Sequence, residues 1–132
     1  MVLILIFIQQ ISIVMSDRKI PKDLDCGMAM IMEIIGGKWK PCLIHNISRG
    51  YKRPSELQRL NPKATRRVLY QQLTELEGYG IIEKVIFPVL PPKVEYSLTS
   101  LGMSLLPVIR VMDDWGTQYL ENPGQHPTLK TA

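Results

Sequence analysis

The stretch that decides the fold of this chain is PKATRRVLYQQLTELEGYGIIEKVIFPVLPPKVEYSLTSLG, which runs from Pro62 to Gly102. It predicts a helix that begins after Thr65 with an arginine pair, then a short stop and two strands joined by a proline-rich tip. Such a helix can enter a DNA major groove, and a hairpin behind it can reach the neighbouring backbone. This order of elements predicts a winged helix and, with it, a DNA-binding protein.

The predicted helix after Thr65 has an apolar face and a polar face. Leu69, Leu73 and Leu76 recur at i, i+4 and i+7 and form one apolar stripe, so core packing fixes the orientation of the helix. The opposite face is basic and rich in hydrogen-bonding groups. We expect DNA contacts from Thr65, Arg66, Arg67, Tyr70 and Gln71.

These side chains suit two kinds of contact. Arg66 or Arg67 can donate two hydrogen bonds to guanine, and Gln71 can pair with adenine. Thr65 and Tyr70 suit phosphates. The alternative interpretation is a solvated helix face whose charges serve only solubility.

Basic residues are concentrated between Lys38 and Arg67. This segment has nine Lys or Arg residues against one acid, Glu56, and so has a charge of +8, although the whole chain has a formal charge of +4. Charge gathered around one predicted helix pair is typical of a phosphate-binding face. We therefore expect phosphate contacts from Lys52, Arg53, Ser55 and Lys63.

Two shorter features flank the main helix. A helix from Ser55 to Leu60 precedes it, and the N-terminus of that helix is a natural phosphate site. The hairpin at 81–98 follows it, and Lys93 in its tip is expected to meet the DNA backbone or minor groove. The predicted fold class is mainly α with a small β-hairpin, a winged helix-turn-helix domain.

Further helices are predicted on both sides of this unit. Met28 to Ile35 is almost entirely apolar, Trp39 to Ile47 repeats apolar residues at helical spacing, and Cys42 on it is expected to pack inside. A last helix follows Thr99 and runs to about Tyr119. Because one small domain cannot bury both apolar end helices, we expect N- and C-terminal dimerisation helices and a two-fold homodimer.

The length of 132 residues allows one compact domain. We expect an N-terminal arm or extension at 1–25, the DNA-binding and dimerisation domain at 26–121, and a flexible tail at 122–132. The first fifteen residues are apolar, but their continuous run ends at Ile8, which is short for a membrane span. Three interpretations remain open: the natural start is Met15, the segment packs on the body or a partner chain, or it anchors the chain to a membrane.

The sequence gives no sign of an enzyme, a metal site or a cofactor. It has no paired carboxylates, no Ser/His/Asp set, no Gly-rich phosphate loop and no cluster of metal ligands. Its two cysteines do not make a disulfide framework, which fits a reducing cytoplasm. The leading hypothesis is a non-enzymatic DNA-binding regulator. The alternative is a winged-helix module whose basic face binds an acidic protein.

Five separate motifs occur in order along the chain: IGGKWKP (Ile35 to Pro41), SEL (Ser55 to Leu57), LYQQLTELEGYGIIEK (Leu69 to Lys84), PPKVEYSLTSLG (Pro91 to Gly102) and DDWG (Asp113 to Gly116). Together they resemble the HxlR family of bacterial winged-helix regulators, from roughly Cys26 to Gly116. The resemblance implies a cytoplasmic, dimeric transcription regulator, related in architecture to the MarR group, that binds near-palindromic promoter DNA.

The family resemblance also bears on one cysteine. Some members sense oxidants or electrophiles through a cysteine just before the first helix, and Cys26 matches that position. The family normally has proline next, whereas this chain has Gly27. Cys26 is therefore the candidate redox sensor, and a helix N-terminus is a place where a thiolate is stabilised.

Overall fold

The computed structural model describes residues 24–122 and residue 124. The expectations for residues 1–23 and 125–132 lie outside these described residues. The chain divides into two units at Gly36–Gly37. The described part of the first unit is one helix, α2 (Gly27–Ile35), whose start just after Cys26 was predicted.

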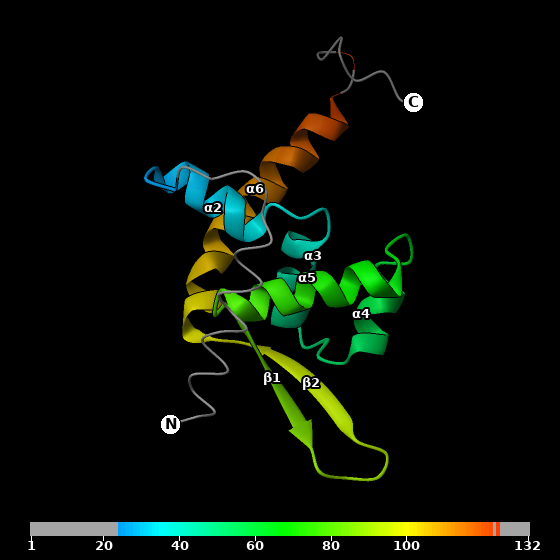
Figure 1. The fold of residues 1–132 in the computed structure, drawn as a ribbon. Helices are drawn as coiled ribbons and strands as arrows, with labels where there is room; N and C mark the ends of the chain where they lie inside the picture. Colours follow the sequence, from blue (N-terminus) through cyan, green and yellow to red (C-terminus); the bar gives the residue numbers. More distant parts are fainter. Residues whose placement is uncertain (1–23, 123, 125–132) are drawn as a thin grey trace. The chain divides into compact units, whose positions relative to one another are not determined.

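The second unit begins with three helices, and they lie where the sequence predicts them (Figure 1). They are α3 (Lys40–Ser48), α4 (Pro54–Leu60) and α5 (Arg66–Gly78). Leucine and isoleucine side chains from all three form the core, and the largest fully buried ones are Leu43, Ile44, Leu57, Leu69, Leu73 and Leu76. Apolar burial of this kind is the main force that holds the helices together.

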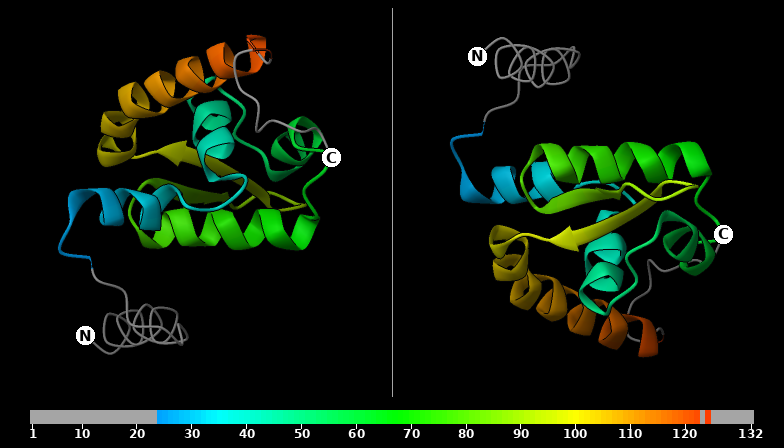
Figure 2. Two further views of the ribbon diagram at one scale, coloured as in Figure 1. Left: turned by 90° about the horizontal axis from the view of Figure 1, so that it is seen from above. Right: turned by 90° about the horizontal axis from the view of Figure 1, so that it is seen from below.

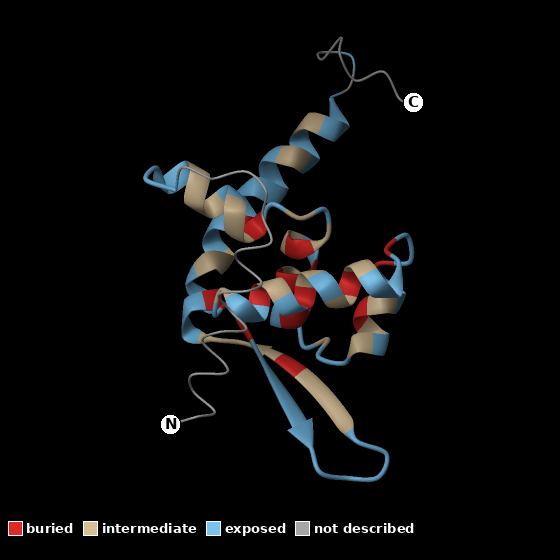
Figure 3. Ribbon diagram, in the orientation of Figure 1, coloured by how far each residue is buried: buried red, intermediate tan, exposed pale blue. Residues whose placement is uncertain are grey.

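A two-stranded antiparallel hairpin follows α5. Strand β1 (Ile82–Phe87) pairs with β2 (Lys93–Leu98) in a register that sets Ile82 opposite Leu98 and Phe87 opposite Lys93. Ile82 and Tyr96 are buried, the rest of β1 and the tip are exposed, and the rest of β2 is half-buried as the hairpin projects from the helices (Figure 3). The backbone N–H of Tyr96 also donates to the carbonyl oxygen of Lys52 at 2.8 Å, so the loop before α4 is tied to the wing.

The last element is the 22-residue helix α6 (Ser100–Glu121). The Thr99 hydroxyl caps it by accepting a hydrogen bond from the Gly102 N–H at 3.0 Å. Gly102 approaches the preceding turn so closely that an added Cβ would lie 2.1 Å from the carbonyl oxygen of Ile81, so only glycine fits. Helices α5 and α6 lie on opposite sides of the hairpin base and of α3, which contacts both (Figure 2).

The predicted fold class is therefore confirmed, with one correction inside α3. Cys42 was expected to pack inside, but it is exposed. The buried face of α3 is made by Lys40, Leu43, Ile44 and Ile47, and position 42 points away from that face. In the described part of the chain, no helix combines the length and the apolar character that crossing a membrane requires.

Candidate nucleic-acid interface

The exposed face of α5 is positioned by its cap and by its buried face. The Thr65 hydroxyl accepts a hydrogen bond from the Val68 N–H at 3.2 Å and so fixes where the helix begins. Leu69, Leu73 and Leu76 are fully buried behind it. The opposite face therefore stays in solvent and presents Thr65, Arg66, Arg67, Gln71 and Thr74.

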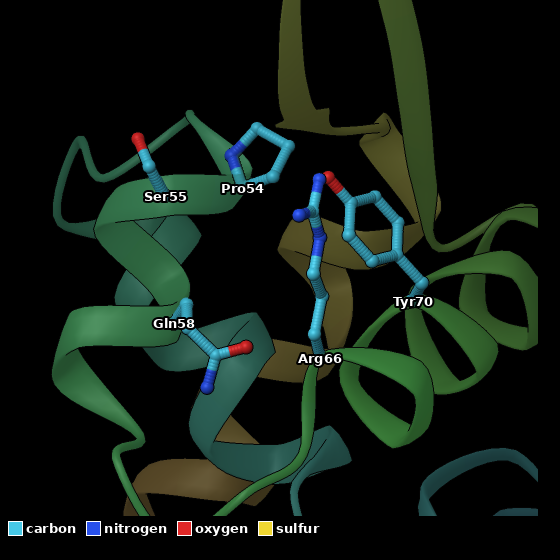
Figure 4. A pocket seen from close by; sticks show the side chains of 5 residues that line it. All are labelled: Pro54, Ser55, Gln58, Arg66 and Tyr70. Carbon is cyan, nitrogen blue, oxygen red and sulfur yellow. The ribbon is translucent and has the colours of Figure 1, made fainter.

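Arg66 and Tyr70 form the corner of this face that is nearest to α4. The Arg66 guanidinium carbon lies 5.6 Å from the centroid of the half-buried Tyr70 ring, a cation–π contact. Both side chains line an open pocket of about 310 Å³ between α4 and α5, together with Pro54, Ser55 and Gln58 (Figure 4). Sequence analysis missed Pro54 and Gln58, because the apolar pattern of α4 does not indicate which of its polar positions line a pocket; of its leucines, Leu57 is buried and Leu60 is exposed.

The turn between α4 and α5 is held by side-chain amides. The Asn61 amide donates to the Leu57 carbonyl oxygen at 2.8 Å, and the Gln58 amide donates to the Ala64 carbonyl oxygen at 2.7 Å. Asn61 and Ala64 are buried, whereas Lys63 between them is exposed. The turn thus presents Lys63 to solvent beside the start of α5.

The start of α4 presents Lys52, Arg53 and Ser55 to solvent, as the sequence predicts. The carboxylate of Glu56 accepts the backbone N–H groups of Lys52 at 3.1 Å and Arg53 at 3.3 Å. This carboxylate thus accepts hydrogen bonds from backbone N–H groups at the start of α4. The side chains of Lys52 and Arg53, rather than the N-terminus of α4 alone, are therefore the groups that can bind an anion here.

Lys93 occupies a different part of the hairpin from the one that the sequence predicts. It is the first residue of β2 rather than part of the tip. Its ammonium group forms an ion pair with Glu95 at 3.1 Å and lies 5.4 Å from the centroid of the Phe87 ring. The tip beyond it, residues 88–92, consists of proline, valine and leucine and is exposed.

Lys40 is a cation of the basic segment that does not belong to this face. Its side chain is only 3% exposed and forms an ion pair with Glu75 of α5 at 2.5 Å. Beside it, the Trp39 backbone N–H donates to the Gln72 side-chain oxygen at 2.9 Å. These contacts join α3 to α5, and the available charge of the face is smaller than the sequence count suggests.

Cys26, in the first unit, is the N-cap residue of α2 and is exposed. The nearby backbone N–H groups of Ala29 and Met28 hold the pKa of its thiol below the usual value. In the described residues, no group of three or more His, Cys, Asp or Glu side chains is arranged to hold a metal ion.

Comparison with known proteins gives a family, close relatives and similar structures. A family model for the HxlR-like helix-turn-helix matches residues 34–123. The chain is 48% identical to YdeP of Bacillus subtilis (strain 168) over 94 residues, which cover 71% of this chain and 73% of YdeP. It is 43% identical to YkvN of the same organism over 100 residues, covering 76% and 85% of the two chains. Both relatives are described as uncharacterized HTH-type transcriptional regulators.

The solved structures that resemble this chain include the redox regulator HypR in two forms. The reduced form has a TM-score of 0.72 and 38% sequence identity, and the match covers 76% of this chain and 100% of that chain. The oxidized form has a TM-score of 0.67 and 42% identity, covering 70% of this chain and 96% of that chain.

Proposed function

This chain belongs to the HxlR-like helix-turn-helix family of transcriptional regulators, and we propose that it binds double-stranded DNA by laying α5 in the major groove. The observation that supports this role is the division of α5 into two faces. Its leucines are fully buried, and its opposite face presents two arginines, a glutamine and two threonines to solvent. These are residue types that pair with base edges and phosphates.

The other basic side chains lie on elements that flank α5 and serve the DNA backbone. Lys52, Arg53 and Ser55 at the start of α4 and Lys63 in the turn before α5 are all exposed and suit phosphates. The hairpin at 82–98 is the wing, which reaches the backbone or the minor groove. Since Lys93 is paired with Glu95, its contribution there is smaller than that of a solvated lysine.

The working form is a homodimer that binds a near-palindromic operator in the cytoplasm. Helix α6 exposes apolar side chains that a monomer leaves in water: Leu101, Met103, Val108, Val111, Met112, Trp115 and Leu120. An apolar surface of this extent favours a protein partner. A two-fold dimer presents two copies of α5, each to one half-site, about one helical turn of DNA apart.

Cys26 gives this regulator a redox-sensitive or electrophile-sensitive thiol. Three observations support that role: its exposure, the lowered pKa of its thiol, and the similarity of the chain to HypR, which is described as a redox regulator. Diamide treatment should then change the operator affinity of the natural protein but not that of Cys26→Ser. An unchanged affinity of the natural protein would rule out the sensor role.

The DNA-binding role is tested with the DNA that lies upstream of the gene for this protein. We expect a gel shift that weakens steeply as salt rises, because Lys and Arg contacts release counterions from the phosphates. The double variant Arg67→Ala/Gln71→Ala should lose specific affinity. Arg110→Ala, which removes one exposed cation from α6, is the matched control and should bind nearly as well as the natural protein.

One result would favour the alternative, a protein-interaction module whose basic face binds an acidic protein. In that case the natural protein binds its upstream DNA no better than unrelated DNA, at low salt and at high salt alike. The double variant then makes no difference to DNA binding.

A further inference from the structure

Two neighbouring arginines start α5, and their surroundings differ. We propose that the pocket between α4 and α5 is a phosphodiester-binding site in which Arg66 holds the DNA backbone, while Arg67 and Gln71 alone contact base edges. This inference rests on the proposed function and assigns different roles to two side chains that the sequence treats as equivalent.

The geometry of Arg66 favours a backbone contact. Successive residues of a helix point about 100° apart, so the side chains of Arg66 and Arg67 leave α5 in different directions. Arg66 points toward α4 and lies against the Tyr70 ring, with its guanidinium carbon 5.6 Å from the ring centroid (Figure 4). A side chain extended into the groove would give up this stabilising contact. Arg67 has no such restraint among the described residues.

The lining of the pocket suits a phosphate group. Arg66 is the one charged residue among the five that line it, and Ser55 and Tyr70 add hydroxyl donors. A guanidinium group pairs with two phosphate oxygens at once, and a planar group already held against an aromatic ring needs little ordering to do so. Glu56, which follows Ser55 in the sequence, has one carboxylate oxygen engaged by the backbone N–H groups of Lys52 and Arg53.

Gln58 lines the same pocket with a side-chain amide whose orientation is fixed by hydrogen bonds. Its amide nitrogen donates to the carbonyl oxygens of Ala64 at 2.7 Å and Asn61 at 3.5 Å, which sets the orientation of the amide. Its side-chain oxygen is buried and has no hydrogen-bond partner in the described part of the chain. An acceptor buried without a partner costs free energy, so a group that reaches this oxygen from the pocket and donates to it is favoured.

The test compares Arg66→Ala with Arg67→Ala on two DNA fragments of equal length, the upstream DNA of the gene and an unrelated sequence, over a series of salt concentrations. Arg66→Ala should weaken binding to both fragments by the same factor. It should also reduce the slope of log K against log salt by about 0.9, the value for one lost phosphate contact. Arg67→Ala should weaken only the specific complex, by about 5- to 150-fold, the equivalent of about 1–3 kcal/mol.

Three further variants distinguish binding in the pocket from a general loss of positive charge. Arg66→Lys keeps the charge but loses the bidentate pairing, so it should retain the salt slope and recover only part of the affinity. Tyr70→Phe keeps the ring under Arg66 and should be milder than Tyr70→Leu, which removes it. Because Arg66 is exposed and loses only its contact with the Tyr70 ring, the thermal midpoint of its variants should stay within a few degrees of that of the natural protein.

The outcomes distinguish this inference from the proposed function. If Arg66→Ala abolishes discrimination between the two fragments and leaves the salt slope unchanged, Arg66 contacts a base and the inference is wrong. If the natural protein itself does not discriminate between the fragments, the proposed function fails first and the inference fails with it.

Discussion

Helices α5 and α6 are both amphipathic, and they differ in what they leave in solvent. Helix α5 buries leucines and exposes arginine, glutamine and threonine, whereas α6 buries Gly102 and Ile109 and exposes large apolar side chains. The two helices lie on opposite sides of α3 and the hairpin base (Figure 2). A polar cationic face suits a polyanion, and an apolar face suits another protein surface.

The comparison teaches that the chemistry of the exposed face, not amphipathicity, indicates the partner of a helix. It also separates two kinds of mutation. A change on a buried face alters folding, and a change on an exposed face alters one partner only. The following substitutions test this separation, starting with the largest expected effect.

The buried face of α5 should matter most for stability. Leu73→Ala removes a fully buried side chain, and such truncations cost about 2–5 kcal/mol because the cavity does not close completely. Urea unfolding followed by circular dichroism measures this loss. The neighbouring exposed Thr74→Ala is the control and should change the free energy of unfolding by less than about 0.5 kcal/mol. Equal effects would contradict the assignment of the two faces.

The exposed face of α6 should matter for association instead. Trp115 is 67% exposed in the single chain, so Trp115→Ala should leave the folding of the monomer nearly unchanged. If Trp115 anchors a dimer interface, its loss should weaken dimerisation by about 2–4 kcal/mol. Sedimentation velocity over a concentration series measures this, with Thr117→Ala as the control. A monomeric natural protein at micromolar concentration would contradict the role given to α6.

Lys40 should behave as a residue of the core although it is a cation. Lys40→Met removes the ion pair with Glu75, and a partly buried charge left without its partner costs about 1–3 kcal/mol. The salt slope of DNA binding should not change, because Lys40 is not exposed to phosphates. Lys52→Ala is the comparison variant, since it should reduce the slope while sparing stability. A lower slope for Lys40→Met would place Lys40 on the DNA face.

The cap of α5 should contribute less. Thr65→Ala removes the hydroxyl that accepts the Val68 N–H, and losing such a cap costs about 0.5–2 kcal/mol. Thermal denaturation measures this, and Thr65→Ser should keep most of the stability because it keeps the hydroxyl. If Thr65→Ser is as destabilised as Thr65→Ala, the hydroxyl is not the group that matters.

Cys26 gives the smallest effect and a pH dependence with a definite sign. The Ala29 and Met28 N–H groups lower the pKa of its thiol, so the reactive thiolate is populated at lower pH than in an ordinary cysteine. In a Cys42→Ser background, the rate of alkylation should therefore rise with pH at a lower midpoint than in a peptide of residues 24–29. Equal midpoints would remove this explanation of reactivity.

Much of the fold could be predicted from periodicity. The leucine spacing of α5, the glycine stop and the strand pattern of the hairpin each reflect a local rule, and each element lies within a residue or two of its predicted bounds. The exposed basic face followed from the same rule, because burying one side of a helix exposes the other. The roles of its residues in DNA contact stay predictions until binding is measured.

Each error concerns a side chain whose surroundings depend on how the helices pack against one another. The sequence places Lys40 among the residues of the basic segment. In the structure it pairs with Glu75, which lies 35 residues further along the chain. Cys42 was expected to be buried because its helix is apolar overall, yet it points away from the packed face. Pro54 and Gln58 became part of a pocket only through the packing of α4 beside α5.

The sequence by itself determined which segments are helix and strand and which side of α5 faces water, because those properties depend on neighbours within a few residues. The tertiary structure decided which cations remain available to an anion and which residues of α4 share a pocket with Arg66. Electrostatic contacts depend on distances through space, and the spacing of residues along a chain does not fix those distances.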